Sequence, residues 1–404
     1  MAQVHLTLNE EILKGLFAGD SEAALKALLT EVLNVVLRGE ASEQIGAAAY
    51  ERSEGRTVYR NGYRERGYTT RLGKLTLQIP KLREGQFTTE LFKRYARSEQ
   101  ALLSAMMEMV LQGVSTRNVS EITEQLCGRK FSATTVSTLC KELDPAVEAF
   151  RSRPLEGSYR FVCCDAIYMR VHREYRVVSV GLFIAIGVNE EGRREVLGFD
   201  TMTAESTSAW KAFFQGLMDR GLHGVELITS DAHGGIKSAI QEKFPGAAWQ
   251  RCQTHFSRNV LERCPKSLRA EIHRALNDMY NAPDLEGCKA RFAAMLTKYG
   301  DQAAKAMKVL EDGFFDVISI YALPEAYRKR LRTSNGIERL NEELRRRERA
   351  LRIFPNEASL LRLMGALLLE QHEQWMTGNR YLPTGDIALS PALGWANERA
   401  GTAA

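Results

Sequence analysis

The sequence predicts a mixed α/β protein, in which an α/β core is interrupted by an all-α insertion and preceded by a mostly helical N-terminal region. Residues 158–255 alternate short apolar runs, rich in β-branched and aromatic side chains, with stretches of helical spacing. Residues 256–332 have helical spacing and no strand pattern. Residues 1–50 and 99–152 are again mostly helical in pattern. These observations define the expected order of the chain.

Length and composition are those of a globular protein of two or three domains, with 404 residues, 44% of them hydrophobic and 26% charged. No apolar run approaches the roughly 18 residues of a membrane span, so we expect no membrane partner. The first residues lack the basic and apolar pattern of a signal peptide. Seven cysteines without disulfide-like spacing favour a reducing cytoplasm.

Residues 1–50 form the predicted N-terminal helical region. Apolar residues recur at intervals of three and four over 6–38, and Gly39 follows as a stop signal. Such a stripe is typical of core or of an oligomer contact. The tail at 377–404, with two prolines and an alanine-rich end, is expected to be loosely ordered.

Residues 51–98 form a predicted basic, β-rich region. Residues 51–100 carry 12 Lys or Arg against 6 Asp or Glu, and residues 74–80 have a strand pattern after Gly73. Arg60, Arg64 and Arg66 are interleaved with tyrosines, which suits phosphate contact and stacking. A β-rich loop region that is merely basic is the alternative.

Residues 99–152 contain a predicted helix-turn-helix. One helix runs through Val119 and Leu126, a break follows at 127–129, and Ser132 is placed to cap a second helix over 133–143. Any short helical hairpin has a similar pattern, so this motif is a hypothesis. The polar residues of the second helix that can meet base edges and phosphates are Thr134, Thr135, Ser137, Thr138 and Lys141. Residues 151–157 are interpreted as a linker.

The α/β core begins with three predicted strands, at 160–170, 175–188 and 194–199, joined by short turns that imply an antiparallel meander. A helix at 206–220, a strand at 225–229, a helix at 232–244 and a strand at 247–250 follow. The intervening helix allows the strand at 225–229 to lie parallel to a strand of the sheet. This is the order of an RNase H-like fold, and residues 158–255 are its expected first part.

The all-α insertion at 256–332 is expected to separate this first part from the C-terminal helices of the core at 333–376. One of these helices begins near Asn335, and a strongly apolar one covers 357–375. Residues 325–352 carry 10 Lys or Arg against 5 Asp or Glu. Two separate basic tracts indicate an extended polyanion such as DNA, although solvated helix faces with ion pairs explain the same counts.

Three carboxylates form the candidate chemical site. Asp165 lies in the middle of a buried strand, where a bare carboxylate is costly unless it is paired or binds a metal. Asp231 ends a strand that can lie beside it, and Glu338 is in the first turn of a helix that can cover the same edge. Converging carboxylates suit hard divalent cations, and two Mg²⁺ ions can activate a hydroxyl and stabilise the leaving oxygen of a phosphodiester.

Two of these carboxylates also have structural explanations. Asp231 stands where it can cap the following helix, and Asn335 and Glu338 match a capping box. Strand propensity gives no such reason for Asp165. Glu342, one turn after Glu338, is the competing third ligand.

The chain resembles the Mutator-type bacterial insertion-sequence transposases, a DDE family with an RNase H-like catalytic domain. The matching stretches follow the order of the chain and cover nearly all of it: ERSEGRTVYRNGYRER (51–66), LQIPKLREG (77–85), GVSTRNVSEI (113–122), RPLEG (153–157), DAIYMRV (165–171), GRREVLGFD (192–200), SDAHGGIK (230–237), WQRCQTHFSRNV (249–260), SNGIERLNEELRRR (334–347) and IFPNEASLLRL (353–363). The resemblance implies that Asp165, Asp231 and Glu338 are the catalytic and metal-binding triad, with two Mg²⁺ ions for which Mn²⁺ substitutes.

Further residues gain candidate roles beside this triad. Cys252-x-x-His255 matches a signature of the family. On its own it supplies two ligands of a zinc site, and no convincing second pair of ligands follows in the sequence. The alternative is that the two residues have a structural role and orient the end of the strand. His233, two residues after Asp231, is a candidate for hydrogen bonding or DNA contact, and Trp249 is interpreted as core. The basic residues near Glu338 expected to contact phosphates are Arg339, Arg345, Arg346 and Arg347.

The resulting hypothesis is a DNA transposase that binds the terminal inverted repeats of its element, cuts a phosphodiester and joins the exposed 3′-OH to target DNA. Double-stranded DNA is the expected partner, and a dimer or larger assembly is expected because two ends must be held together. Residues 6–38 and 357–375 are candidate interfaces. The resemblance implies a bacterial cytoplasmic, nucleoid-associated protein. A metal-dependent nuclease or resolvase that does not join, and a non-catalytic repeat-binding regulator, are the alternatives.

Overall fold

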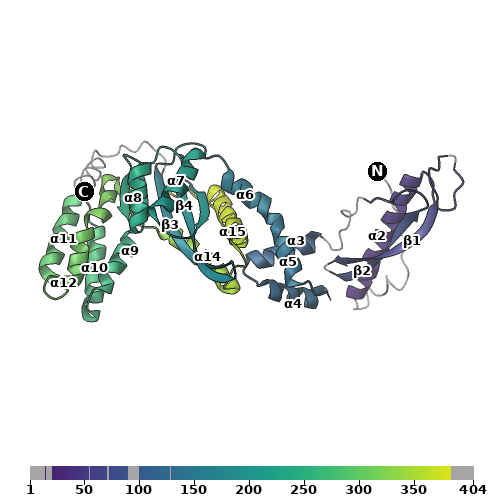
Figure 1. The fold of residues 1–404 in the computed structure, drawn as a ribbon, viewed down its shortest axis with the longest axis horizontal. Coiled ribbons are helices and arrows are strands. Elements are labelled where there is room, and N and C mark those ends of the chain that lie inside the picture. Colours follow the sequence, from purple (N-terminus) through teal and green to yellow (C-terminus); the bar gives the residue numbers. More distant parts are fainter. Residues whose placement is uncertain are drawn as a thin grey trace. The chain divides into compact units, whose positions relative to one another are not determined.

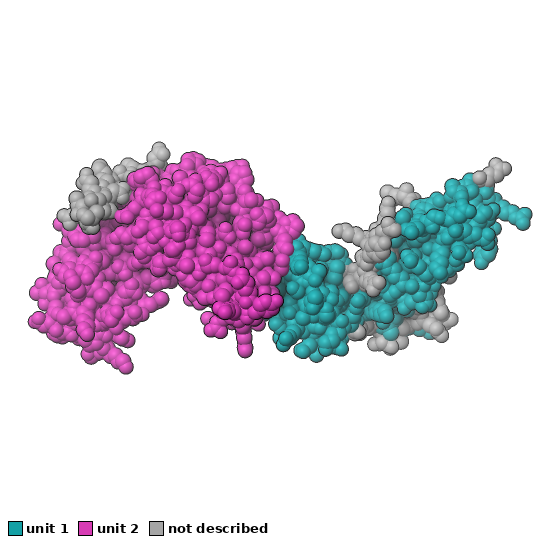
Figure 2. Space-filling view, in the orientation of Figure 1, with its two compact units in different colours: residues 1–142 teal, residues 143–404 magenta. Residues whose placement is uncertain are grey.

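The computed structural model describes residues 14, 21–53, 55–70, 72–89, 100–127 and 129–383. The chain divides into two compact units, residues 1–142 and residues 143–404 (Figures 1 and 2). Each unit is described by itself below. None of the helices in the described part of the chain combines the length and apolar character needed to cross a membrane.

The first unit begins with helix α2 (Ser21–Ile45), which packs on a two-stranded sheet. Leu37 on the helix meets Leu75, Leu77 and Ile79 in a small core. The helix continues past Gly39, so the expected stop at this glycine is wrong. The apolar face of α2 serves as core within one chain, and the part of the expected 6–38 helix before residue 21 lies, apart from residue 14, outside the described residues.

Strands β1 (Arg60–Thr70) and β2 (Gly73–Leu82) form this sheet as an antiparallel hairpin. The expected strand at 74–80 falls within β2 and is confirmed. β2 alternates buried and exposed residues because one face covers α2, whereas most of β1 is exposed. The sequence pattern missed β1 for this reason, since Gly62, Gly67 and charged residues obscure any period of two.

Three helices complete the first unit: α3 (Gln100–Leu111), α4 (Thr116–Cys127) and α5 (Ala133–Cys140). Ser132 caps α5 as expected, because its hydroxyl accepts a hydrogen bond of 3.0 Å from the Thr135 amide. Val119 and Val136 are fully buried between these helices. Arg129 then ties this group to the hairpin by donating to the Thr69 hydroxyl at 2.6 Å.

The second unit contains a five-stranded sheet in the order β5-β4-β3-β6-β7. Its strands are β3 (Phe161–Arg173), β4 (Arg176–Val188), β5 (Arg194–Met202), β6 (Leu227–Ser230) and β7 (Ala248–Arg251). β3, β4 and β5 pair antiparallel, as the expected meander requires, and β6 lies parallel to β3. β6 and β7 are also parallel. The mixed α/β class predicted for this region is therefore confirmed.

Helices cover both faces of this sheet (Figure 1). α7 (Thr207–Asp219) and α8 (Gly234–Lys243) cover one face, where Trp210 is fully buried and stacks on Phe183 at 4.1 Å between ring centroids. α15 (Glu357–Thr377) covers the other face at β5. It approaches closely at Gly365, where a Cβ atom would stand 2.9 Å from the Phe199 ring. The apolar face of α15 is thus core in the single chain.

Helix α6 (Asp144–Ser152), which the sequence groups with residues 99–152, lies in the second unit. Arg362 of α15 donates two hydrogen bonds, of 2.6 and 2.8 Å, to the Asp144 carboxylate at the start of this helix. Two parallel N–H···O bonds to one carboxylate define geometry as well as adding energy. α6 is therefore anchored to the helix that backs the sheet.

The all-α segment follows β7. Its α-helices are α9 (Gln253–Glu262), α10 (Arg269–Tyr280), α11 (Leu285–Tyr299), α12 (Ala304–Gly313) and α13 (Glu325–Leu331). They surround a core that continues into the sheet at Phe161, Leu227 and Ala248. α14 (Asn335–Leu351) then returns to the sheet and packs against β3. Residues 378–383 are not loose as expected, because Tyr381 and Leu382 donate backbone bonds to Gly192 and Leu382 is buried. The rest of the expected tail, 384–404, lies outside the described residues.

Candidate active site

Asp165 is on the central strand β3, at a position where the side chain faces α14. Cys164 before it points into the core under α7 and α8 and is fully buried, so Asp165 must point to the opposite face. There the Asn341 amide of α14 donates a hydrogen bond of 2.7 Å to Oδ2, and the Ala166 amide donates one of 2.9 Å to Oδ1. The carboxylate is therefore held from both sides.

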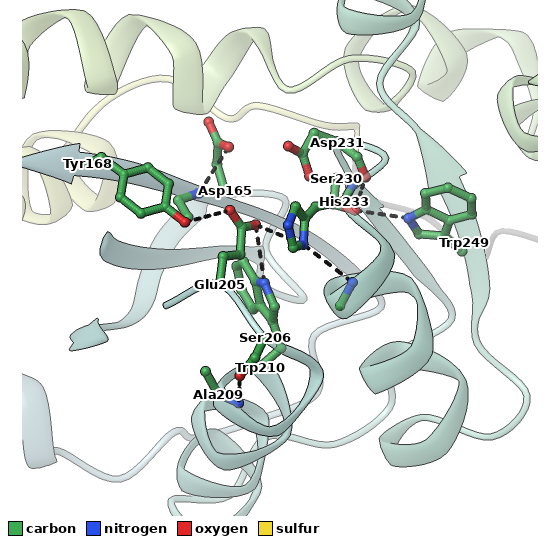
Figure 3. Close-up of polar contacts among 12 residues, drawn as sticks. Asp165, Tyr168, Glu205, Ser206, Ala209, Trp210, Ser230, Asp231, His233 and Trp249 are labelled. Atoms are coloured by element: carbon green, nitrogen blue, oxygen red, sulfur yellow. Dashed lines mark hydrogen bonds and ion pairs between the residues drawn. The ribbon is translucent and has the colours of Figure 1, made fainter. Parts of the chain in front are cut away.

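Asp231 follows β6 directly and comes beside Asp165. β6 pairs with β3 in the register Phe161 to Leu227 through Cys163 to Thr229, and two more residues in the same register bring Asp231 opposite Asp165. Figure 3 shows both carboxylates projecting on the same side of the sheet. The backbone amide of His233 donates to Asp231 Oδ1 at 3.3 Å. The helix cap of α8 is His233, whose Nδ1 accepts from the Gly235 amide, so Asp231 does not serve as that cap.

Glu338 reaches the same region from the first turn of α14. Its Oε1 accepts a hydrogen bond of 3.4 Å from the Ser334 hydroxyl and lies 3.6 Å from Nε2 of His255. Ser334, and not Asn335, is the N-cap of α14, so the capping-box explanation for Glu338 is wrong. Glu342 is exposed on the same helix.

The pKa of Asp165 reflects its burial and the carboxylates around it. The pKa of Asp165 is raised from 3.8 to about 7, chiefly by burial and then by the nearby carboxylates of Asp231 and Glu338, against lowering contributions from the Ala166 amide and His255. A buried carboxylate with two further carboxylates nearby is stabilised by cations that prefer oxygen ligands. The arrangement has the donor set for hard divalent ions.

Cys252 and His255 lie directly behind Glu338. Cys252 is the N-cap of α9, and its buried sulfur accepts hydrogen bonds from the Ser334 amide at 3.3 Å and the Ser334 hydroxyl at 3.1 Å. Burial opposes ionisation of the thiol, but interactions with His255 and Ser334 outweigh it and lower the pKa of Cys252. The interaction with Cys252 raises the pKa of His255 to about 9, against burial, and the carboxylates of Asp165 and Glu338 add to the rise.

A second group of residues lines the Asp165 and Asp231 pair on the side of α7. The Glu205 carboxylate accepts hydrogen bonds from the Tyr168 hydroxyl at 3.1 Å and from Trp210 Nε1 at 3.2 Å, and His233 Nδ1 lies 3.8 Å from it (Figure 3). The Trp249 indole donates to the Ser230 hydroxyl at 2.9 Å and is half-buried, in keeping with the core role expected for it. Glu205 therefore connects the sheet, α7 and the start of α8.

Sequence reasoning missed Asn341 and Glu205. Asn341 is three residues after Glu338, so both lie on the face of α14 that meets β3, and this spacing was the available signal. Glu205 stands in a segment between β5 and α7 without a motif, and its contacts to Tyr168 and His233 depend on tertiary structure alone.

The residues predicted to contact DNA are mostly at the surface of their units. Thr134, Thr135, Thr138, Lys141, Arg64, Arg339, Arg345 and Arg346 are exposed, and Ser137, Arg60, Arg66 and Arg347 are half-buried. Arg346 forms an ion pair of 2.8 Å with Glu343. Arg60 has structural partners instead, since it donates to the Ala47 carbonyl at 3.2 Å and to the Ser42 hydroxyl at 2.8 Å and so fastens the end of α2.

A basic groove, which the sequence did not predict, opens beside the start of α9. It has a volume of about 670 Å³ and lies between α9, α10 and α13. Its cationic lining comprises Arg258, Arg269, Lys329 and Arg332, and it also includes Gln253 and Thr333, which adjoin Cys252 and Ser334. The groove therefore approaches Glu338 from the all-α segment.

Comparison with known proteins identifies the family of the chain. Residues 1–378 match the family described as "Transposase, Mutator family". The chain is 41% identical to the transposase for insertion sequence element IS256 in transposon Tn4001 of Staphylococcus aureus, over 94% of this chain and 98% of that one. It is 43% identical to the transposase for element ISRM5 of Rhizobium meliloti, over 90% and 91%, and 41% identical to that for element IS1081 of Mycobacterium tuberculosis, over 95% and 92%.

Proposed function

The chain belongs to the Mutator family of transposases, and we propose that it is the DNA transposase of an insertion sequence, which cuts the DNA at the ends of its element and joins the exposed 3′-OH to target DNA. The observation that carries this proposal is the meeting of Asp165, Asp231 and Glu338 in a chain whose relatives are named as insertion-sequence transposases.

The catalytic unit is proposed to be RNase H-like, with the triad beside the end of β6, where Asp165 of β3 faces α14. The mixed sheet with three antiparallel strands followed by two parallel ones supports this assignment. In open sheets, ligands gather where strands end beside a crossover. The three carboxylates come from residues 66 and 107 positions apart, so only the fold can bring them together.

Asp165, Asp231 and Glu338 would hold two Mg²⁺ ions, for which Mn²⁺ would substitute. The fit is supported by an all-oxygen donor set and by the proximity of the carboxylates of Asp231 and Glu338, which add to the effect of burial on the pKa of Asp165. When bound, such ions lower the pKa of the attacking water or hydroxyl and neutralise the leaving oxygen of the phosphodiester. The chain's own task is orientation, in which the Asn341 amide fixes Asp165 and the His233 amide fixes Asp231.

DNA would be bound by both units. In the first unit, α4 and α5 are proposed as a helix-turn-helix whose exposed residues Thr134, Thr135 and Thr138 meet the inverted repeat. In the second unit, Arg339 and Arg345 on α14 extend from Glu338 along an exposed face and suit phosphate contact. Because two element ends must be held together for joining, a dimer or larger assembly is proposed on DNA.

End cleavage and joining by the purified protein test this function. The substrate is a labelled duplex of the terminal inverted repeat, with Mg²⁺ or Mn²⁺. We expect joined product from the wild type and none from Asp165→Ala, Asp231→Ala or Glu338→Ala, whereas Glu342→Ala keeps activity. Cleavage without joining, also on pre-nicked ends, would instead indicate a nuclease or resolvase. Repeat binding without chemistry in any metal would indicate a regulator.

A further inference from the structure

Two helix N-termini meet behind Glu338 and bring a thiol, an imidazole and a carboxylate together. The Gln253 amide at the start of α9 donates to the Arg332 carbonyl at 3.1 Å, just before α14. Ser334, the N-cap of α14, donates from its amide and its hydroxyl to the Cys252 sulfur. These bonds hold the two helix starts against each other.

One ligand atom each from Cys252, His255 and Glu338 lies within 4.8 Å of the others. This set differs from the all-oxygen triad, because sulfur and nitrogen suit zinc-type ions whereas Mg²⁺ avoids them. Tetrahedral coordination with bonds of about 2.3 Å to sulfur and 2.0 Å to nitrogen requires the ligand atoms to approach to roughly 3.5 Å. His255 and Glu338 are half-buried at helix starts, so side-chain rotation can supply this change.

Two independent features indicate that these groups are prepared for an ion. The Cys252 sulfur accepts two hydrogen bonds at a helix N-terminus, an environment that favours the thiolate, which is the metal-binding form. Nδ1 of His255 is buried and has no hydrogen-bond partner among the described residues. A buried ring nitrogen without a partner costs free energy that a bound cation would recover.

We propose that Cys252, His255 and Glu338 form a second metal site, selective for thiophilic divalent cations of the zinc class. Three protein ligands leave the fourth position to water, which is the composition of an open zinc site. An ion held there takes Glu338 away from the triad, so occupancy of this site inhibits DNA joining. The inhibition rests on the proposed role of Glu338 in catalysis, whereas binding of the ion does not.

Cobalt titration of the full-length, metal-free protein tests the site directly. Co²⁺ bound to a thiolate gives a sulfur-to-metal charge-transfer absorption, which Mg²⁺ ligands cannot produce. We expect this band to saturate at one equivalent, to be displaced by Zn²⁺, and to disappear in Cys252→Ser. It persists in Asp165→Asn, which alters only the oxygen triad, and in Cys264→Ser, a control at another buried cysteine. A missing band, or a band that survives Cys252→Ser, would overturn the proposal.

A second variant guards against misfolding of Cys252→Ser. Glu338→Gln changes a half-buried side chain and keeps the sulfur, so Co²⁺ is expected to bind with the band intact but about tenfold or more weakly. Unchanged affinity would exclude Glu338 as a ligand. Joining assays with Mg²⁺ and added Zn²⁺ then test the inhibition, and full activity with the site occupied would overturn it. If no joining occurs under any condition, the proposed function fails while the cobalt titration still decides the site.

Discussion

Asp165→Asn should change how the stability of the second unit depends on pH when metal is absent. The pKa of Asp165 is about 7 in the folded protein against 3.8 for the isolated group. Between pH 3.8 and about 7, Asp165 is therefore protonated in the folded protein but ionised in the unfolded chain. The free energy of unfolding of the wild type therefore falls as the pH rises from about 4 to about 7. In Asp165→Asn this decrease is absent, because the amide does not ionise.

The expected size follows from the same two values. Each pH unit of separation corresponds to about 1.4 kcal/mol, so the full displacement amounts to about 4 kcal/mol. The carboxylate is partly accessible to solvent, which screens its charge, and we expect about 2–4 kcal/mol. The pKa of His255 is raised from 6.5 to about 9, so titration of this residue also lowers the free energy of unfolding as the pH rises above 6.5, in both proteins. The difference between wild type and variant reports on Asp165 together with its electrostatic interaction with His255.

Tryptophan fluorescence in guanidinium chloride with EDTA measures this difference, because all four tryptophans lie beyond residue 142 and report on the second unit. Relative to wild type, Asp165→Asn should gain about 2–4 kcal/mol between pH 4.5 and pH 7.5. Mg²⁺ at pH 7.5 should stabilise the wild type and leave the variant nearly unchanged. Glu343→Gln, an exposed carboxylate on α14, is the control. A pH-independent difference would refute the electrostatic description of the site.

Three further perturbations test orientation, DNA contact and the core. Asn341→Ala should lower joining about tenfold or more without weakening DNA binding, because it removes the amide that orients Asp165, and equal loss in binding would contradict this role. Arg258→Ala in the basic groove should weaken DNA binding for all sequences and reduce the salt slope by about one, and an unchanged slope would place the DNA elsewhere. Trp210→Ala should cost about 3–5 kcal/mol by denaturation followed with circular dichroism; less than 1 kcal/mol would contradict its core role.

The fold of the second unit was predictable because each element carries a local signal. β3, β4 and β6 contain apolar runs, and α7 has Trp210 and Phe213 on one face, so period and turn residues define both type and order. β1 was not predictable in the same way, since a mostly exposed strand of a two-stranded sheet has no buried face to impose alternation. The end of α2 was misplaced because Ala41 and Ile45, beyond Gly39, pack against Leu82 of β2 and stabilise the helix there.

The candidate site, like the fold, was only partly predictable from the sequence. Asp165 could be found from sequence because a carboxylate in an apolar run violates strand preferences, and the family resemblance added Asp231 and Glu338. Asn341, which orients Asp165, and Glu205, which contacts Tyr168 and His233 beside the site, were missed because such polar residues are common and their partners are distant in sequence. The sequence indicated Cys252 and His255 as two ligands of the proposed second metal site. The third ligand, Glu338, was not recognised because it had been assigned to the carboxylate triad.

The all-α segment has a consequence for the site beyond separating Asp231 from Glu338. The Thr229 hydroxyl on β6 donates to the Leu331 carbonyl at 2.8 Å. Leu331 is the last residue of α13 and lies shortly before Ser334, the N-cap of α14. Gln250 on β7 donates to the Val317 carbonyl and accepts from the Ile320 amide, so the segment is fastened to the strand ends at several points. An unfastened connection of this length would leave α14 free to move, whereas these buried hydrogen bonds deliver Ser334 and Glu338 to a defined position. The geometry of the three carboxylates therefore depends on the folding of the whole second unit.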